Sequence, residues 1–142
     1  MSADIEQITA LINEYAYRLD AGDLDGVAAL FEHAELGSTR HERRRHGVSG
    51  ARTIYDGVII YEDGTPKTLH QITNVIVQVD GATATARSCF AVLQVTSLGL
   101  HPILAGEYHD RFEPHDGGWR FTERIFDPRL VGDLSSHMKG NS

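Results

Sequence analysis

The sequence has one cysteine, no long apolar run and no excess of basic residues, and each shortage excludes a class of protein. Cys89 alone cannot form an internal disulfide, and a single thiol cannot by itself build a metal site. No apolar segment approaches the roughly 20 residues that are needed to cross a bilayer. Because 20 acidic residues outnumber 13 basic ones, we expect neither nucleic acid nor an anionic membrane as a partner.

The rest of the composition is that of an ordinary globular chain. Its 142 residues suit one domain, and 41% of them are hydrophobic. We expect a single domain over residues 1–133 and a loose tail over residues 134–142. The N-terminus lacks the basic and apolar regions of a secretion signal, which predicts a cytoplasmic location.

Amphipathic spacing predicts three helices in the first half of the chain. Apolar residues from about Ile5 to Leu19 form one stripe, and Gly22 stands where that helix would end. A short helix over 24–31, with Asp23 as its N-cap, and a third helix over about 50–61, with Ser49 as its N-cap, are expected next. Residues 34–48 are mostly polar and lie between these helices.

After Pro66 the pattern changes to strands. Residues 69–79 are rich in β-branched side chains and end at Asp80-Gly81, a strong hairpin signal. We expect further strands over 83–95, 103–113 and 119–126, with turns at 98–102 and 115–118. Helices first and an antiparallel meander afterwards predict an α+β fold, with the helices packed on one face of a curved antiparallel sheet.

Asp20 and His70 are the first candidates for chemistry. Asp20 falls in the last turn of the first helix, where the partial negative charge of the helix end disfavours a carboxylate. It either points into water or is compensated by a cation, and His70 is a candidate for that cation. If Asp20 holds one ring nitrogen of His70, the other nitrogen is free to act as a general base. A structural histidine is the alternative.

Arg124 and Tyr15 are polar residues on elements that are otherwise apolar. Arg124 lies late in an aromatic-rich strand, either at a rim or as a buried cation that needs an anionic partner or a substrate oxygen. Tyr15 lies on the core stripe of the first helix, where it packs or donates its hydroxyl to a ligand.

Four further residues are candidates for substrate binding. Asn74 alternates with His70 along one strand, which indicates hydrogen-bonded core groups or the wall of a cavity. Asp110 shares a strand face with Tyr108, and its role is open. The candidates are Asn74, Tyr108, Asp110 and Phe126.

A basic run interrupts this acidic chain at residues 40–46. Four arginines and one glutamate give it a local charge of +3, in a chain with a formal net charge of −7. Such a run is usually a solvated loop, and the alternative is that it steers an anionic ligand or partner. His41 and His46 lack further ligands, so we expect no metal, and no motif indicates a cofactor.

The motifs together resemble the SnoaL-like branch of the nuclear transport factor 2-like superfamily. The resemblance spans about residues 5–127 and comprises four segments in order: Ile8-x-x-Leu11-x-x-x-Tyr15-x-x-x-Leu19-Asp20-x-Gly22-Asp23, Leu69-His70-x-x-Thr73-Asn74, Gly106-x-Tyr108-x-Asp110-x-Phe112, and Gly118-Trp119-Arg120-Phe121-x-x-Arg124. It implies a cone-shaped α+β barrel with an interior pocket. Scytalone dehydratase, bile-acid 7α-dehydratase and hexachlorocyclohexane dehydrochlorinase belong to this group.

The resemblance also implies roles for the candidate residues. An Asp–His pair at the positions of Asp20 and His70 acts as the base in the dehydrochlorinase and the bile-acid enzyme, and an arginine on the last strand resembles Arg124. Tyr15 has the spacing to Asp20 of an essential tyrosine in the bile-acid enzyme. We therefore expect a cofactor-independent lyase of a small hydrophobic cyclic molecule that forms a homotrimer or homodimer. An isomerase or cyclase with the same base, or a non-catalytic binding or assembly module, is the alternative.

Overall fold

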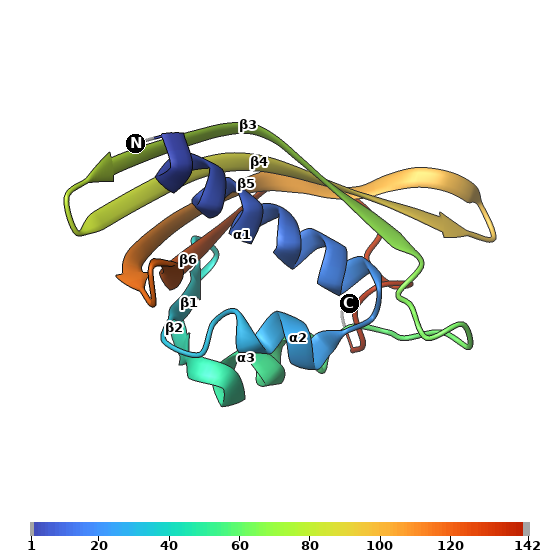
Figure 1. The fold of residues 1–142 in the computed structure, drawn as a ribbon. Coiled ribbons are helices and arrows are strands. Elements are labelled where there is room, and N and C mark those ends of the chain that lie inside the picture. Colours follow the sequence, from blue (N-terminus) through green and yellow to red (C-terminus); the bar gives the residue numbers. More distant parts are fainter. Residues whose placement is uncertain (1, 141–142) are drawn as a thin grey trace.

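The computed structural model describes residues 2–140, which form three helices and six strands (Figure 1). The helices are α1 (Ser2–Asp20), α2 (Leu24–Ala29) and α3 (Gly47–Tyr55). The strands are β1 (Glu35–Ser38), β2 (His41–His46), β3 (Thr68–Asp80), β4 (Thr83–Thr96), β5 (Gly99–His115) and β6 (Gly118–Val131). No helix of the described part is long and apolar enough to cross a membrane.

The strands form one sheet in the order β2-β1-β6-β5-β4-β3, which confirms the predicted α+β fold. Strands β3 to β6 are an antiparallel meander, and β1 adds to β6 in parallel. The sheet curves over α1, and α2 and α3 lie below (Figure 1). Within residues 2–140 the sheet stays open, with β2 and β3 as its two edges, so it does not close into a full barrel.

Helix α1 buries the predicted stripe against the sheet. Ile8, Ile12, Tyr15 and Leu19 are each at most 2% exposed. The predicted cap of α2 is confirmed, because the Asp23 carboxylate accepts a hydrogen bond from the Gly26 backbone N–H. Helix α3 differs from the prediction. It begins after His46 instead of Ser49 and ends at Tyr55, where the chain turns towards a short bridge between Val58 and Met138.

Two stretches expected as connections are strands. Residues 35–38 and 41–46 form β1 and β2, and the basic run is therefore an edge strand instead of a loop. A four-residue strand such as β1 is too short to give a periodic signal, and an edge strand tolerates charged side chains. The turn expected at 98–102 is shorter than predicted, because β4 and β5 pair up to Thr96 and Gly99 and leave only Ser97 and Leu98 between them.

A β-bulge in β3 interrupts the expected alternation. The pairing of β3 with β4 shifts between Thr73 and Ile76, and Asn74 adopts a left-handed backbone with φ of 55°. Asparagine tolerates this conformation better than other residues with a side chain. Because of the bulge, Asn74 and Ile76 are exposed and do not share the buried position of His70.

Residues 134–140 pack against the body of the protein, in contrast to the loose tail expected from their sequence. The His137 carbonyl accepts a hydrogen bond from the Ile59 N–H, and the Lys139 N–H donates to the Gly57 carbonyl. His137 is 5% exposed, and Leu134 and Met138 pack on the core. Residues 141 and 142 of the expected tail lie outside the described part of the chain.

Candidate active site

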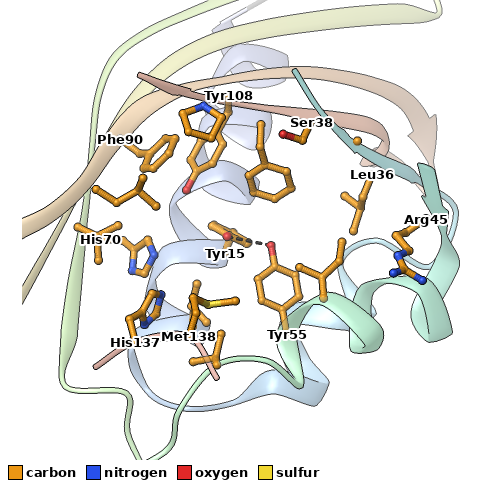
Figure 2. Close-up of a pocket in the computed structure, with 18 of the residues that line it drawn as sticks. Tyr15, Leu36, Ser38, Arg45, Tyr55, His70, Phe90, Tyr108, His137 and Met138 are labelled. Carbon is orange, nitrogen blue, oxygen red and sulfur yellow. Dashed lines mark hydrogen bonds between the residues drawn. The ribbon is translucent and has the colours of Figure 1, made fainter. Parts of the chain in front are cut away.

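A cavity of about 560 Å³ lies between α1, α3, the concave face of the sheet and the C-terminal segment (Figure 2). Aliphatic and aromatic side chains form most of its wall, and a few polar groups converge on it. The lining residues are Tyr15, Leu19, Leu36, Gly37, Ser38, His41, Arg43, Arg45, Ile54, Tyr55, Val58, His70, Phe90, Val92, Leu104, Tyr108, Phe126, Pro128, His137 and Met138. A small apolar molecule of a few rings fits such a space.

His70 and Asp20 form a hydrogen-bonded pair at the wall of this cavity. The Nδ1 atom of His70 lies 2.7 Å from Oδ1 of Asp20, and the histidine side chain is 4% exposed. An ionised carboxylate accepts only, so Nδ1 carries the proton and donates it. This leaves Nε2 as an acceptor, and within residues 2–140 Nε2 has no hydrogen-bond partner.

Asp20 is fixed by three donors at the end of α1. Besides the imidazole, the Thr68 hydroxyl donates to Oδ1 at 2.9 Å and the backbone N–H of His70 donates to Oδ2 at 2.7 Å. These hydrogen bonds stabilise a carboxylate at the unfavourable helix end, where the sequence predicts either water or a cation. The carboxylate is therefore positioned to hold the imidazole in one tautomer.

His137 is a second histidine at the cavity wall, and sequence reasoning missed it. Its ring centre lies 6.2 Å from that of His70 (Figure 2), and its Nδ1 is buried without a partner among the described residues. Burial, and secondarily the charge of His70, lowers the pKa of His137 to about 4. It is therefore a neutral imidazole beside His70. A lone histidine in a polar C-terminal stretch gives no sequence signal of this.

Tyr15 and Tyr55 share a hydrogen bond inside the cavity. Their hydroxyl oxygens lie 2.9 Å apart, and the two residues are 2% and 4% exposed (Figure 2). Burial raises the pKa of both phenols, so both stay protonated at neutral pH. One hydroxyl proton lies between the two oxygens and the other is free to donate. Tyr55 was not predicted, although Ala51 and Tyr55 form a buried i, i+4 pair on α3 that marks its inner face.

Arg124 and Asp110 are brought together, but behind the cavity wall. Two hydrogen bonds of 2.7 and 2.9 Å join the guanidinium to the carboxylate, and both side chains are fully buried. The guanidinium carbon lies 3.8 Å from the Tyr108 ring centre and 4.5 Å from that of Tyr15. Neither Arg124 nor Asp110 is among the residues that line the cavity, so Arg124 is a buried cation with an anionic partner, one of the alternatives from the sequence. Burial lowers the pKa of Arg124, but the paired Asp110 more than offsets this.

The remaining candidates divide between the wall and the exterior. Tyr108 and Phe126 line the cavity, and Tyr108 stacks on Phe90 with ring centres 4.4 Å apart. Asn74 does not reach the cavity, because the bulge turns it to the exposed side. Phe90 was missed by the sequence analysis, although its alternation with Val92 on β4 indicates an inward face.

One group of possible metal ligands lies away from the cavity. Within residues 2–140, ligand atoms of Glu107, His109 and Asp127 lie within 4.8 Å of one another. Arg87 donates to Glu107 at 2.7 Å, and Arg129 lies 3.2 Å from Glu107 and 2.8 Å from Asp127. The hydrogen bond from Arg87 lowers the pKa of Glu107. Two guanidinium groups thus already compensate both carboxylates, and the group is an ion-pair network.

Comparisons with known proteins agree with this architecture. A family model described as the SnoaL-like domain matches residues 1–125, and no curated protein matches the chain. A Mycobacterium tuberculosis protein of unknown function is 27% identical with a TM-score of 0.76, over 91% of this chain and 73% of that chain. A candidate scytalone dehydratase from Novosphingobium aromaticivorans is 21% identical with a TM-score of 0.74, over 99% and 95% of the two chains. A hexachlorocyclohexane dehydrochlorinase from Novosphingobium barchaimii is 19% identical with a TM-score of 0.71, over 94% and 91%.

Proposed function

The chain belongs to the SnoaL-like domain family, and we propose that it is a cofactor-independent lyase of the dehydratase or dehydrohalogenase type. Its substrate is a small, largely hydrophobic cyclic molecule. The observation that carries this proposal is the 2.7 Å hydrogen bond between Asp20 and His70 at the wall of an apolar cavity of about 560 Å³. A purely structural pair would not need an open space beside the free nitrogen.

His70 acts as the general base in this mechanism. Its Nε2 takes a proton from a carbon atom of the substrate, and Asp20 stabilises the imidazolium that forms at Nδ1. The electron pair of the broken C–H bond becomes the new carbon–carbon π bond, and the leaving group departs with its own bonding pair. A positioned base contributes typically 10²–10⁴-fold, and the exclusion of water by the cavity adds to this.

The Tyr15–Tyr55 pair assists the departing group. Both phenols remain protonated, so the free hydroxyl proton donates to a leaving hydroxide, which departs as water, or solvates a leaving halide. Arg124 acts from behind the aromatic wall, where its charge lies 4.5 Å from the Tyr15 ring and favours negative charge on the phenol. The proposal thus assigns Arg124 a positioning role instead of contact with substrate.

Two fold relatives have names that denote the same reaction class. The names of the candidate scytalone dehydratase and the hexachlorocyclohexane dehydrochlorinase both denote eliminations, in which a proton and a neighbouring group leave a ring. At sequence identities of 21% and 19% these relatives show a shared fold only, so the proposed reaction is argued from the geometry of the site.

A test uses turnover of ring substrates by three proteins. Hexachlorocyclohexane, scytalone and hydroxylated ring ketones are incubated with the wild type, His70→Ala and Asp20→Asn, and released chloride or the dehydrated product is measured. We expect one compound class to react, with kcat/KM reduced at least about 100-fold in both variants. The control is His33→Ala, whose histidine side chain is 46% exposed and lies outside the cavity lining. A wild-type rate of turnover in His70→Ala would contradict the role of His70 as the general base.

An isomerase is the second candidate function, and the neutral tyrosine pair favours it. Two adjacent phenols can hold the oxygen of an enolate that His70 forms, and the proton then returns to another carbon. Mass spectrometry of the product separates the two reactions, because an elimination releases a small molecule and an isomerisation conserves mass.

We also propose that the chain assembles as a homotrimer or homodimer. The outer face of the sheet exposes apolar side chains that pair across strands, including Leu69 with Leu93 and Val95 with Leu100. Leu69, Val95 and Leu100 are 54%, 57% and 70% exposed. Sedimentation equilibrium gives the mass in solution, and a monomer at micromolar concentration would contradict the assembly.

A further inference from the structure

Strand β2 presents a row of basic side chains to the cavity. Residues alternate along a strand, and His41, Arg43 and Arg45 all line the cavity from this edge. Their neighbours across β1 confirm the direction, because Arg45 pairs with Leu36 and His41 with Ser38, and both partners also line the cavity. We call His41, Arg43 and Arg45 the basic rim.

The intervening arginine has a different environment. Arg44 turns to the other face, where it lies 3.7 Å from Glu35 and 3.9 Å from Glu123. It packs over Gly37, where a Cβ atom would lie only 2.6 Å from Arg44 Nη1. Arg44 is thus compensated by two carboxylates, whereas Arg43 and Arg45 have no acidic partner within residues 2–140.

The described residues that line the cavity provide no negative charge for the basic rim either. None of the described residues that line the cavity is an aspartate or glutamate. Figure 2 shows His70 and His137 on one side of the cavity and Arg45 on the opposite side. The cavity therefore has two histidines at one end, an apolar middle, and at the other end arginines that form no ion pair within residues 2–140.

We propose that the substrate is amphipathic and carries an oxyanion, of the carboxylate class, that binds to Arg43 and Arg45 while its ring system reaches His70. This inference rests on the proposed function for the ring end and names the substrate class of the same site. Guanidinium groups recognise carboxylates through paired, charge-assisted hydrogen bonds. The anion would also fix the orientation of the rings, so that one carbon faces Nε2 of His70.

The test compares two fluorescent probes with the same aromatic skeleton. Anilinonaphthalene sulfonate carries an anion, and phenylnaphthylamine is its neutral counterpart. Titration of each probe gives a Kd for the wild type, Arg43→Gln and Arg45→Gln. We expect each substitution to raise the Kd of the sulfonate about tenfold and to leave that of the neutral probe within about twofold.

The matched control is Arg44→Gln, one residue away on the outer face, which should leave both Kd values unchanged. Added salt should weaken the sulfonate alone, because screening acts on its charge. Displacement of the sulfonate by naphthoate, but not by naphthamide, shows that a carboxylate occupies the same place. Equal changes for both probes, or no change in either rim variant, would overturn the proposal. Thermal unfolding of each variant separates loss of the site from loss of the fold.

The test of anion binding at the basic rim can be separated from the test of the elimination chemistry. Asp20→Asn weakens the base at a residue that does not line the cavity, so the sulfonate Kd should stay within about twofold of the wild type. Rim-dependent binding without His70-dependent turnover would sustain the anion site and contradict the lyase. If turnover depends on His70 but Arg43→Gln and Arg45→Gln leave the sulfonate Kd unchanged, the result would support the lyase and contradict the anion site.

Discussion

The imidazole of His137 is buried beside His70 with one ring nitrogen unpaired, and this makes it a source of acid sensitivity. Its pKa is lowered from 6.5 to about 4, first by burial and then by the charge of His70, while Asp20 partly opposes the shift. The unfolded chain therefore binds a proton as pH falls through 6.5, whereas the folded chain does so only near 4. Folding stability is thus lost across this window as pH falls.

We expect His137→Phe to flatten the pH dependence of stability. In the wild type, His137 should lower the free energy of unfolding by about 2 kcal/mol as pH falls from about 7 to about 5, because the unfolded chain takes up a proton there and the folded chain does not. Urea unfolding at the two pH values measures the difference. His33→Phe, at an exposed histidine, should retain the wild-type slope. An unchanged slope in His137→Phe would show that His137 is protonated in the folded state.

Residues with a local anomaly could be predicted, and residues defined by distant contacts could not. Asp20 stands out because a carboxylate at a helix end is unfavourable, and that feature is local to the sequence. The place of Arg124 depends on its register opposite Asp110 across β5 and β6, which no local pattern fixes. His137 enters the site only because the C-terminal segment docks between Gly57 and Ile59.

At the scale of elements, the end of α1 positions the carboxylate of the candidate dyad. The Asp23 N–H donates to the Arg18 carbonyl and the Gly22 N–H to the Leu19 carbonyl, with Gly22 at φ of 80°. This is a helix C-cap of the kind that glycine favours. A Cβ atom on Gly22 would lie 1.9 Å from the Gly64 carbonyl oxygen, so the loop before β3 packs directly on this turn.

We expect Gly22→Ala to destabilise the fold by more than about 2 kcal/mol. The left-handed backbone costs about 1 kcal/mol for an alanine, and displacement of the Gly64 backbone adds to it. Gly81→Ala is the matched control, since Gly81 also has a positive φ but its Cβ would meet no atom within 4 Å. Guanidinium unfolding of both variants compares them. Equal losses would mean that the contact with Gly64 is easily relieved.

Element type was predictable where periodicity runs long. The stripe of α1 and the β-branched run that ends at Asp80-Gly81 extend over many residues, and the corresponding helix and strands are present. The sequence patterns did not predict strands β1 and β2, because β1 has only four residues and β2 carries mostly charged side chains. Strand β1 forms because it pairs with β6, which is distant in sequence, and β2 forms because it pairs with β1.

At the scale of the whole molecule, the C-terminal segment completes the hollow interior. His137 and Met138 line the cavity from one end, and the expected tail therefore belongs to the site. Sequence could predict the fold class from the order of elements. The family resemblance implied an interior pocket, but local sequence patterns could not predict which residues form its wall, because the shape of a cavity depends on how distant side chains fill the volume between layers.

We expect a stop after Asp133 to open the cavity and to destabilise the chain. The deletion removes the packing of Leu134 and Met138 on the core; both are partly buried, so each contributes less than the roughly 1.5–3 kcal/mol of a fully buried side chain of this size. Urea unfolding measures the loss of stability, and phenylnaphthylamine titration measures the cavity. A stop after Gly140 is the control and should match the wild type. Undiminished stability of the shorter chain would restore the view of this segment as a loose tail.

The shielding of the dyad has a consequence for the fate of substrate hydrogen. The His70 side chain is 4% exposed and donates its other ring proton to Asp20, so in the proposed mechanism a ligand that fills the cavity would slow the exchange of a proton at Nε2 with bulk water. Deuterium placed on the reacting carbon would then stay on the imidazolium during the lifetime of the bound intermediate. Internal return to the substrate, or transfer to a second carbon, would outpace isotopic washout into the solvent.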